Sequence, residues 1–494
     1  MLGSWSSHSE YQRQVVAGLS RIAKFNPLAL WEYALPISKL FILDLDPLKD
    51  LLVPKYSSTG RPSSNQPEIF RSLVLMNALG FSLSKWLLKL AMNPVLQIAC
   101  GFCGELPSIA SYYDFMNRII ALDERPRVKR KKRKPKEKYG KKKMPPKHPG
   151  IVQKLADRIL MGQRLNLRPE RLLQEIFAKV AVAPSIVLGL VPKTVSVSGD
   201  GTCIKTGASP YGIRTCECRK HGVYNCDCPR RFSDPKATWG WDSHNELYFY
   251  GYMGYFISTY NKAERVDLPL YLRLVEASRH DSVSAVVALA EFRDLYPNLC
   301  VDTFISDSAS DNYATYKLLD KWGISAVIAL NPSGSGNRKY PELLCINDNG
   351  VPVCPGGHKM VYWGFGQDRC RLKWRCPRVC GKCEPCAACK DCSPSSYGRV
   401  IYTKPDWDLR LFTKLPRGSK SFKDKMKERT AAERINNRIL HHYGLENSMV
   451  RGKKRISFFA TVAAFNIHLD AQLAKLKILG LFDFASVFGL ELVA

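Results

Sequence analysis

The chain has 494 residues, of which 45% are hydrophobic and 24% are charged, a balance typical of globular proteins rather than disordered or fibrous ones. Its 74 lysines and arginines outnumber 44 acidic residues, which gives a formal charge of +30. A soluble protein does not need this excess of positive charge. When a protein binds a polyanion, however, each cation that contacts it releases counterions and so favours binding. We therefore expect nucleic acid as the partner, ahead of a ribosome or a membrane surface.

No apolar stretch approaches the roughly 20 residues that a membrane span needs, and the N-terminus lacks the apolar core of a signal peptide. We expect a protein that inserts into no membrane and stays inside the cell, where thiols are kept reduced. The 17 cysteines are accordingly interpreted as metal ligands or buried small side chains, and not as disulfides.

Residues 67–122 are predicted to form several short helices separated by glycine and proline. Pro67 suits a first helical position and Gly80 suits a helix stop. Such a compact set is typical of a helix-turn-helix-like unit, and a small bundle that never touches DNA is the alternative.

Residues 125–150 carry many cations against a single acid, Glu137, and their prolines and glycines prevent a regular element. We predict a basic arm that binds DNA phosphates without sequence specificity, in preference to a merely solvated linker. The cations proposed to contact DNA are Lys129, Arg130, Lys131, Lys132, Arg133, Lys134, Lys141, Lys142 and Lys143.

From residue 191 the apolar residues follow the period of strands. The predicted order is a strand in TVSVSGDGT that ends at Asp200, strands in ELYFYGYMGYFIS and DLPLYLRLVEAS, a helix in SVSAVVALAEFRDLY, a strand in VDTFISDSA that ends at Asp307, a helix in YATYKLLDKWG and a strand in SAVIALN. A Cys-, Gly- and Pro-rich insertion follows, and then a helix in KMKERTAAERINNRILHHYG. This order predicts an α/β fold with a ribonuclease H-like domain.

Three acids have places in this order at which their carboxylates could meet. Asp200 and Asp307 end two strands, and Glu433 lies in a later helix that could pack across the edge of the sheet where those strands end. Carboxylates at short range resist joint ionisation, and divalent cations relieve that cost. Oxygen-only ligands favour Mg²⁺ or Mn²⁺, and two such ions can stabilise both the attacking and the leaving oxygen of a phosphoryl displacement. The alternatives are a plain turn at Asp200 and an N-cap at Asp307, with Asp311 as its competitor.

Arg429, Glu433 and Asn437 are spaced i, i+4, i+8 and should share one face of their helix. Arg429 could orient the carboxylate or hold a substrate phosphate bidentately. An exposed Arg–Glu pair of small energetic weight is the alternative.

Two groups of cysteines have the spacing of metal ligands, and both are predicted to hold structural zinc. The second group has thiols enough for two zinc ions, and an iron–sulfur cluster is its alternative. The first group is Cys216, Cys218, Cys226 and Cys228, and the second is Cys370, Cys376, Cys380, Cys383, Cys386, Cys389 and Cys392.

Two further features lie near the predicted strands. Trp239 and Trp241 could stack on a displaced base near a cut DNA end, or they could belong to the core. Asp281 is interpreted as the N-cap of the helix that follows it.

The motifs together resemble a known family, the bacterial insertion-sequence transposases of the DDE class, in the group with a Tyr-x2-Arg-x3-Glu-x6-Lys signature. The matching segments are GDGT (199–202), FSDPKATWGWDSHNELYFYGY (232–252), DLPL (267–270), SRHDS (278–282), FISDSASDN (304–312) and PRGSKSFKDKMKERTAAERINNR (416–438). The resemblance implies that Asp200, Asp307 and Glu433 are the catalytic acids and that Arg429 is the signature arginine. The signature tyrosine and lysine are replaced by Met426 and Leu440.

The resemblance also implies metal-dependent cleavage at the ends of a mobile element, followed by strand transfer into target DNA. The expected partners are double-stranded DNA, as terminal inverted repeats and as target, and a second copy of the chain in the bacterial cytoplasm. Lys425, Lys427 and Arg438 are candidate DNA contacts beside the last acid. A nuclease without strand transfer and an inactive zinc- and DNA-binding derivative are the alternative functions.

The expected organisation is a ribonuclease H-like catalytic domain with Cys-rich insertions, preceded by an all-helical DNA-binding domain. The units are an N-terminal extension (1–66), the helical domain (67–124), the basic linker (125–150), a helical connector (151–190), the catalytic domain (191–331 and 401–460, with a Cys-rich insert at 203–231), a Cys-rich insertion (332–400) and a C-terminal helical tail (461–494).

Overall fold

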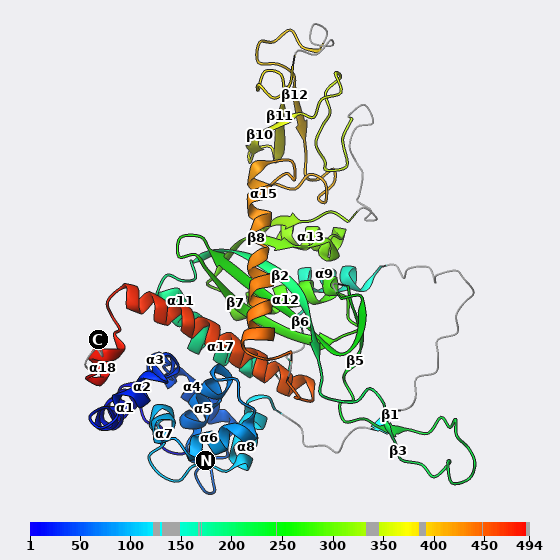
Figure 1. Ribbon diagram of the computed structural model, residues 1–494. Helices are drawn as coiled ribbons and strands as arrows, with labels where there is room; N and C mark the ends of the chain where they lie inside the picture. Colours follow the sequence, from blue (N-terminus) through cyan, green and yellow to red (C-terminus); the bar gives the residue numbers. More distant parts are fainter. Residues whose placement is uncertain are drawn as a thin grey trace.

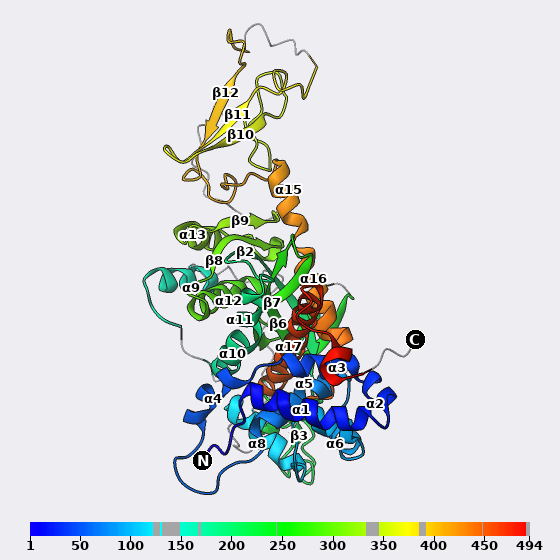
Figure 2. The same cartoon turned by 90° about the vertical axis from the view of Figure 1, so that its left-hand side faces the viewer.

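The structure is a computed structural model that describes residues 1–121, 129–130 (backbone), 149–165, 168, 170–243, 245–331, 345–384, 392–446 and 448–490. It is built in three levels, which both views show in the same order (Figures 1 and 2). Helices from the N-terminal region form the lowest level in these views, a sheet with its helices forms the middle, and a small β lobe projects from the top. The two ends of the described chain lie at the helical level.

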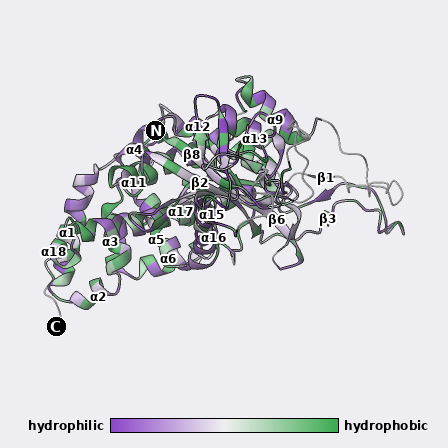
Figure 3. Ribbon diagram, turned by 90° about the horizontal axis from the view of Figure 1, so that it is seen from above, coloured by the Kyte–Doolittle hydropathy of each residue, from purple (hydrophilic) through white to green (hydrophobic). Residues whose placement is uncertain are grey.

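The helical level begins earlier in the chain than residue 67. Its elements are α1 (His8–Ala23), α2 (Pro27–Trp31), α3 (Ala34–Ile42), α4 (Asp46–Leu52), η1 (Val53–Lys55), α5 (Gln66–Ala78), α6 (Leu83–Ala91), α7 (Pro94–Cys100) and α8 (Ile109–Ile119). The helices α5 to α8 occupy the stretch in which short helices were predicted. The earlier helices share their core, because α1 packs on α7 and α3 packs on α5. Apolar and polar residues alternate along these helices, as Figure 3 shows, so each helix buries one side against its neighbours.

Among the described residues, no single helix combines the length and apolarity that a membrane span requires. The helices α5 and α6 meet that test only when they are joined across a bend of 108°.

The sheet of the middle level contains all five predicted strands and one more, β5. The strands are β2 (Thr194–Lys205), β5 (Thr238–Asp242), β6 (Leu247–Asn261), β7 (Val266–Glu276), β8 (Cys300–Ser306) and β9 (Ser325–Ile328). Their order is β7-β6-β2-β8-β9, and β5 also pairs with β6. The pairs β2–β8 and β8–β9 are parallel, and the pairs on the other side of β2 are antiparallel.

The strand β2 extends beyond Asp200, where the sequence analysis ended it. Its parallel partner β8 stops pairing at Ser198, but β6 continues to pair with β2 as far as Lys205. Antiparallel hydrogen bonds on one side are therefore enough to keep the chain extended for five residues after Asp200.

Helices cover both faces of the sheet. The helices α12 (Asp281–Leu295) and α13 (Tyr313–Lys321) lie in the crossovers that the parallel pairs require. The remaining helical elements are α9 (Ile151–Leu160), α10 (Arg171–Phe177), η2 (Ala178–Val182), α11 (Ala183–Val187), η3 (Ser308–Ser310), α15 (Lys420–Lys427), α16 (Thr430–Asn437), η4 (Arg438–His442), α17 (Lys453–Ile478) and α18 (Phe484–Phe488). The single helix predicted around Glu433 is thus divided into α15, α16 and the π-helical turn η4.

The long helix α17 joins the sheet to the helical level, because it packs on both β7 and α5. It runs without interruption through residue 461, where the sequence analysis placed the start of a tail. Its buried His468 hydrogen-bonds with Ser185 Oγ (2.8 Å) and with the carbonyl oxygen of Pro269 (2.7 Å). Burial lowers the pKa of His468 to about 4, so the imidazole is neutral at physiological pH.

The upper lobe contains β10 (Val361–Gly366), β11 (Arg371–Arg375) and β12 (Val400–Thr403), which surround a small apolar core of their own. Arg410, in the chain that returns from the lobe, donates to Asp311 Oδ2 (2.7 Å) and to the carbonyl oxygen of Asn331 (2.7 Å). The side chains of this ion pair are 8% and 0% exposed, so the pair is shielded from solvent.

Replacing Arg410 with Met should lower the free energy of unfolding by about 3–5 kcal/mol, because Asp311 would remain as a buried, unpaired charge. Lys414→Met is the control, since Lys414 and Asp320 form a half-exposed pair 3.8 Å apart. That change should cost less than about 1 kcal/mol. Denaturant unfolding of both variants measures the difference, and equal losses would contradict a structural role for Arg410.

Candidate active site

Asp200 and Asp307 lie at the same edge of the sheet. The last residue pair between the parallel strands β2 and β8 is Ser198 with Ile305, and each aspartate follows two residues later on its own chain. Because parallel strands run in step, both carboxylates stand at the point where β2 and β8 part. The strands that lead to Asp200 and Asp307 are therefore neighbours in the sheet.

Asp307 and Asp311, which the sequence could not separate, have different surroundings. The carboxylate of Asp311 is fully buried and accepts hydrogen bonds from Arg410, from Tyr316 Oη (2.8 Å) and from the backbone N–H of Asn331 (2.6 Å). Asp307 is half-buried and accepts one hydrogen bond from the backbone N–H of Ala309 (3.1 Å), as the N-cap of η3. The bonds of Asp311 are structural, whereas Asp307 keeps acceptor capacity for a ligand.

Arg429 bridges Asp200 and Glu433. Its guanidinium is 2.5 Å from Glu433 Oε1 and 3.8 Å from Asp200 Oδ1. The other oxygen of Asp200 accepts from Asn436 Nδ2 (2.9 Å), so α16 supplies two contacts to this carboxylate. The predicted Arg429–Glu433 pair is confirmed, but the asparagine beside the site is Asn436, because at 3.6 residues per turn position i+7 lies closer to the face of Arg429 than position i+8 does.

Burial is the main cause that raises the pKa of Asp200 to about 7; Arg429 opposes the rise, and the neighbouring carboxylates of Asp307, Asp281 and Glu433 add to it. Four acids therefore act on one another across this edge of the sheet. Such a group of oxygen donors has the chemistry that divalent cations require.

Asp281 was interpreted as a helix N-cap, and this was wrong. The N-cap of α12 is His280, whose Nδ1 accepts from the backbone N–H of Ser282 (3.2 Å). The Asp281 carboxylate instead packs beneath β2: a Cβ on Gly201 would lie 2.7 Å from its Oδ1. Neighbouring residues of a strand point to opposite faces, so Asp281 approaches the sheet from the face opposite to Asp200.

The other glycine of the Gly-Asp-Gly sequence has the same role. A Cβ on Gly199 would lie 2.2 Å from the hydroxyl of Tyr255 and 2.9 Å from the ring of Phe304. The two glycines thus let bulky groups close beneath Asp200. A glycine on each side of a strand carboxylate is the sequence signal that could have revealed this packing.

Met426 and Leu440, which replace the signature tyrosine and lysine, are partly buried and pack against core residues. Met426 packs beside Ile305, Val327 and Phe422, and Leu440 packs against the main core. Their places near Glu433 are therefore apolar contacts in this chain.

The candidate DNA contacts beside Glu433 differ in their surroundings. Lys427 is exposed and pairs with Asp424 (3.3 Å), and Lys425 donates to Ser196 Oγ (2.6 Å). Arg438 forms an ion pair with Asp470 (3.0 Å). Of the linker cations, only the backbone of residues 129–130 is described; Lys131 to Lys134 and Lys141 to Lys143 lie outside the described residues.

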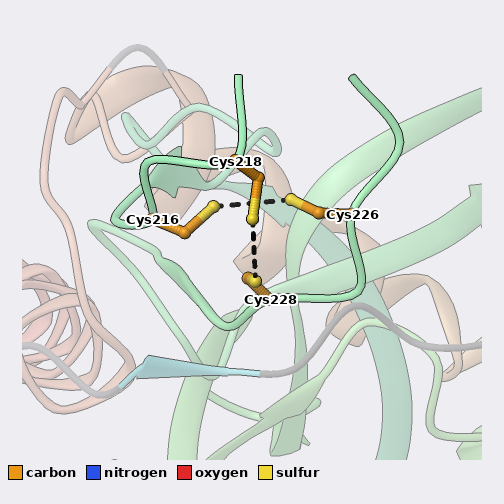
Figure 4. A group of neighbouring side chains, drawn as sticks. All are labelled: Cys216, Cys218, Cys226 and Cys228. Atoms are coloured by element: carbon orange, nitrogen blue, oxygen red, sulfur yellow. Dashed lines mark hydrogen bonds between the residues drawn. The ribbon is translucent and has the colours of Figure 1, made fainter. Parts of the chain in front are cut away.

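Cys216, Cys218, Cys226 and Cys228 converge at the end of an arm beside the sheet (Figure 4). Their sulfurs all lie within 4.8 Å of one another, and the closest pairs are 3.4 and 3.5 Å apart. Four sulfurs about 2.3 Å from a tetrahedral zinc ion are roughly 3.8 Å apart, so the group fits such an ion. Within the described part of the chain, no other set of three or more His, Cys, Asp or Glu side chains converges so closely.

The thiols of this group share protons unequally. The backbone N–H of Cys218 and the thiol of Cys226 lower the pKa of Cys216 to about 7, whereas the other thiols raise the pKa of Cys228 to about 12. A thiol that ionises near neutral pH readily gives the thiolate, and the thiolate is the form that binds a metal.

The basic linker touches the same arm. The arm carries a small sheet in the order β1-β4-β3, in which β1 (Lys129–Arg130) pairs antiparallel with β4 (Arg230–Arg231), and β4 pairs with β3 (Ile213–Arg214). Residues that the sequence analysis assigned to a linker therefore form an edge strand beside the cysteines.

The second cysteine group is only partly described, because Cys386 and Cys389 lie outside the described residues. Cys376 is buried, and Cys370 is exposed at the turn between β10 and β11. Cys380, Cys383 and Cys392 are half-buried. Zinc binding by this group stays a prediction.

Trp239 and Trp241 lie on β5 and form cross-strand pairs with Tyr250 and Tyr248, at ring distances of 5.6 and 4.8 Å. Both tryptophans are about half exposed. They are therefore not core residues, and base stacking by them stays a prediction.

A comparison with known families matches residues 353–469 to the family model of the transposase DDE domain. The matched span runs from the upper lobe through α15 and α16 into α17, so it includes Arg429 and Glu433 and neither catalytic aspartate candidate. A search of curated proteins gave no match. The match of this span to a transposase DDE domain supports a transposase of the DDE class, and such a domain implies DNA as the partner.

The raised pKa of Asp200 predicts that Asp200→Asn stabilises the folded protein, and that it does so more at high pH than at low pH. The folded protein favours the neutral carboxyl, so ionisation costs no stability below about pH 4 and costs the full amount above about pH 7. Without added divalent metal, the stability advantage of the variant should grow by on the order of 2 kcal/mol between pH 5 and pH 8. Thermal unfolding at both pH values measures it; Asp302→Asn, at an exposed position of β8, should show no such growth.

The convergence of the four sulfurs predicts one bound zinc ion. The double variant Cys216→Ser, Cys228→Ser should lose about one zinc per chain, because serine hydroxyls do not replace thiolates. Metal analysis of the purified protein measures the loss. Cys103→Ser, which removes an exposed thiol elsewhere, should leave the zinc content unchanged, and an unchanged content in the double variant would refute the site.

Proposed function

We propose that this chain is a DNA transposase that cuts at the ends of an insertion sequence and joins the freed strand to target DNA. The observation that carries the proposal is the meeting of Asp200, Asp307 and Glu433 at one edge of the sheet. It occurs in a chain whose matched transposase DDE domain contains Glu433.

The topology supports a ribonuclease H-like catalytic domain. Numbered along the chain without β5, the strands lie in the order 3-2-1-4-5, with the first, fourth and fifth parallel and the second reversed. That is the arrangement that the order of predicted elements anticipated. The helical level would then be the DNA-binding unit that precedes it.

Asp200, Asp307 and Glu433 would hold two divalent ions, Mg²⁺ or Mn²⁺. Once bound, such ions would stabilise the charge on the attacking and leaving oxygens of a phosphodiester. Their donor set is oxygen-only and partly buried, which suits these cations. Arg429 would supply the compensating charge that now bridges Asp200 and Glu433, and it could pass to a substrate phosphate when the carboxylates bind metal.

The reaction needs two displacements at phosphorus. In the first, water attacks the phosphodiester at the element's end and a 3′-hydroxyl leaves. In the second, this hydroxyl attacks a phosphodiester of target DNA. The chain's own part is to orient Asp200 through Asn436 and to position Glu433 through Arg429, since both partners lie on α16.

The wider proposal includes a bacterial enzyme of the Tyr-Arg-Glu-Lys signature group, at work in the cytoplasm on the nucleoid. Two copies would bind paired element ends. The four converging cysteines would hold a structural zinc ion that stiffens the basic arm beside the sheet.

Asp307→Asn should abolish Mg²⁺-dependent cleavage of a duplex that carries the element end, because an amide cannot replace the carboxylate as a metal ligand. DNA affinity should change less than threefold. Asp302→Asn, on the exposed part of the same strand, is the matched control and should cleave normally. Cleavage by the Asp307 variant at the normal rate would refute the assignment.

Strand joining separates this proposal from its alternatives. A pre-cut end with a free 3′-hydroxyl should be joined to a target plasmid by the unaltered protein. Cleavage without joining would instead identify a nuclease, and DNA binding without cleavage would identify an inactive derivative.

A further inference from the structure

One face of the upper lobe combines cations with aromatic rings. On the central strand β11, Leu372 and Trp374 are buried in the core of the lobe. Because side chains alternate along a strand, the residues between them point to the other face. We call that side the cation–aromatic face; it consists of Arg371, Lys373, Arg375, Trp363, Tyr397 and Tyr402.

Aromatic rings hold the first two cations against the sheet. The guanidinium of Arg371 is 3.8 Å from the centre of the Tyr402 ring. The Lys373 ammonium is 4.9 Å from the ring of Tyr397 and donates to its hydroxyl (3.2 Å). A guanidinium stacked on a ring keeps its in-plane N–H groups for another partner.

Arg375 is placed between two rings, 4.2 Å from that of Trp363 and 3.4 Å from that of Tyr397. It is 8% exposed, and its Nε has no hydrogen-bond partner among the described residues. Its Nη2 donates to the carbonyl oxygen of Tyr397 (3.1 Å), which fixes the guanidinium, so Arg375 adds a held positive charge to this face.

No carboxylate in the described part of the chain forms an ion pair with Arg371, Lys373 or Arg375. The nearest acid along the chain, Asp368, pairs with Arg369 (3.5 Å) at the turn before β11. Three aligned cations without an internal counter-charge call for an external anion. Alternate residues of a strand are roughly 6.8 Å apart, a separation similar to that between successive phosphates of a DNA strand.

We propose that the cation–aromatic face binds the phosphate backbone of duplex DNA without regard to base sequence. Duplex fits better than single-stranded DNA, because a cation of the chain already lies against one face of each ring, which leaves less ring surface for unpaired bases to stack on. The proposal rests on the proposed function, which makes DNA the partner. It adds a contact surface on the lobe that Arg410 and Asp311 attach to the catalytic sheet.

The test compares the salt dependence of duplex binding for three proteins. They are the unaltered protein, the single variant Lys373→Gln and the double variant Arg371→Gln, Lys373→Gln. Each lost phosphate contact should reduce the slope of log affinity against log salt by about 1, so the slopes should fall by about 1 and about 2. The loss should be the same for an element-end duplex and for a random duplex. Both altered side chains are half-buried and lie outside the lobe core, and thermal unfolding checks that the variants fold.

Lys477→Gln is the charge-matched control, because Lys477 is exposed at the end of α17, away from the lobe. Its slope should match that of the unaltered protein. An unchanged slope in the double variant would overturn the proposal, as would a loss confined to one sequence or to single-stranded DNA. A protein that cleaves normally but shows the unchanged slope would reject only this surface, whereas failure of the unaltered protein to bind any duplex would reject the proposed function as well.

Discussion

The repulsion among carboxylates where β2 and β8 part is the constraint around which the rest of the structure is arranged. Asp200, Asp307, Glu433 and Asp281 all act at this edge, and burial strengthens their mutual effect. Arg429 offsets part of that charge from α16. The glycines on either side of Asp200 allow the fourth acid and Tyr255 to close beneath the strand, so the site is enclosed on the face opposite to the one that α16 covers.

The same turn that presents Asp307 also anchors the upper lobe. Asp311, four residues further along the chain, holds Arg410 in a buried ion pair, and Arg417 adds a hydrogen bond to Tyr316 Oη (2.7 Å) on the following helix. A displacement of the lobe would therefore be felt at the turn that carries a candidate catalytic carboxylate.

Several basic parts of the chain, far apart in sequence, lie at the rim of the α/β level. The arm with the four cysteines gains an edge strand from the 125–150 region through the pairing of β1 with β4. The cation–aromatic face belongs to the upper lobe, whose strands β10, β11 and β12 lie beyond β9 (Figure 2). The arm and the lobe thus each contribute cations, which accords with the large positive charge of the chain.

The sequence by itself determined five strands of the main sheet, the order in which they occur, the candidate acids Asp200 and Asp307 and the spacing of Cys216 to Cys228, because strand period and ligand spacing are local properties. Only the tertiary structure decided which of these side chains contact one another. Asp307 and Asp311 sit in one polar turn and have the same chemistry; burial against Arg410, 99 residues away, made one of them structural. The contacts of Asn436 with Asp200 and of Asp281 with Gly201 likewise depend on helix packing across the sheet, which no period in the sequence encodes.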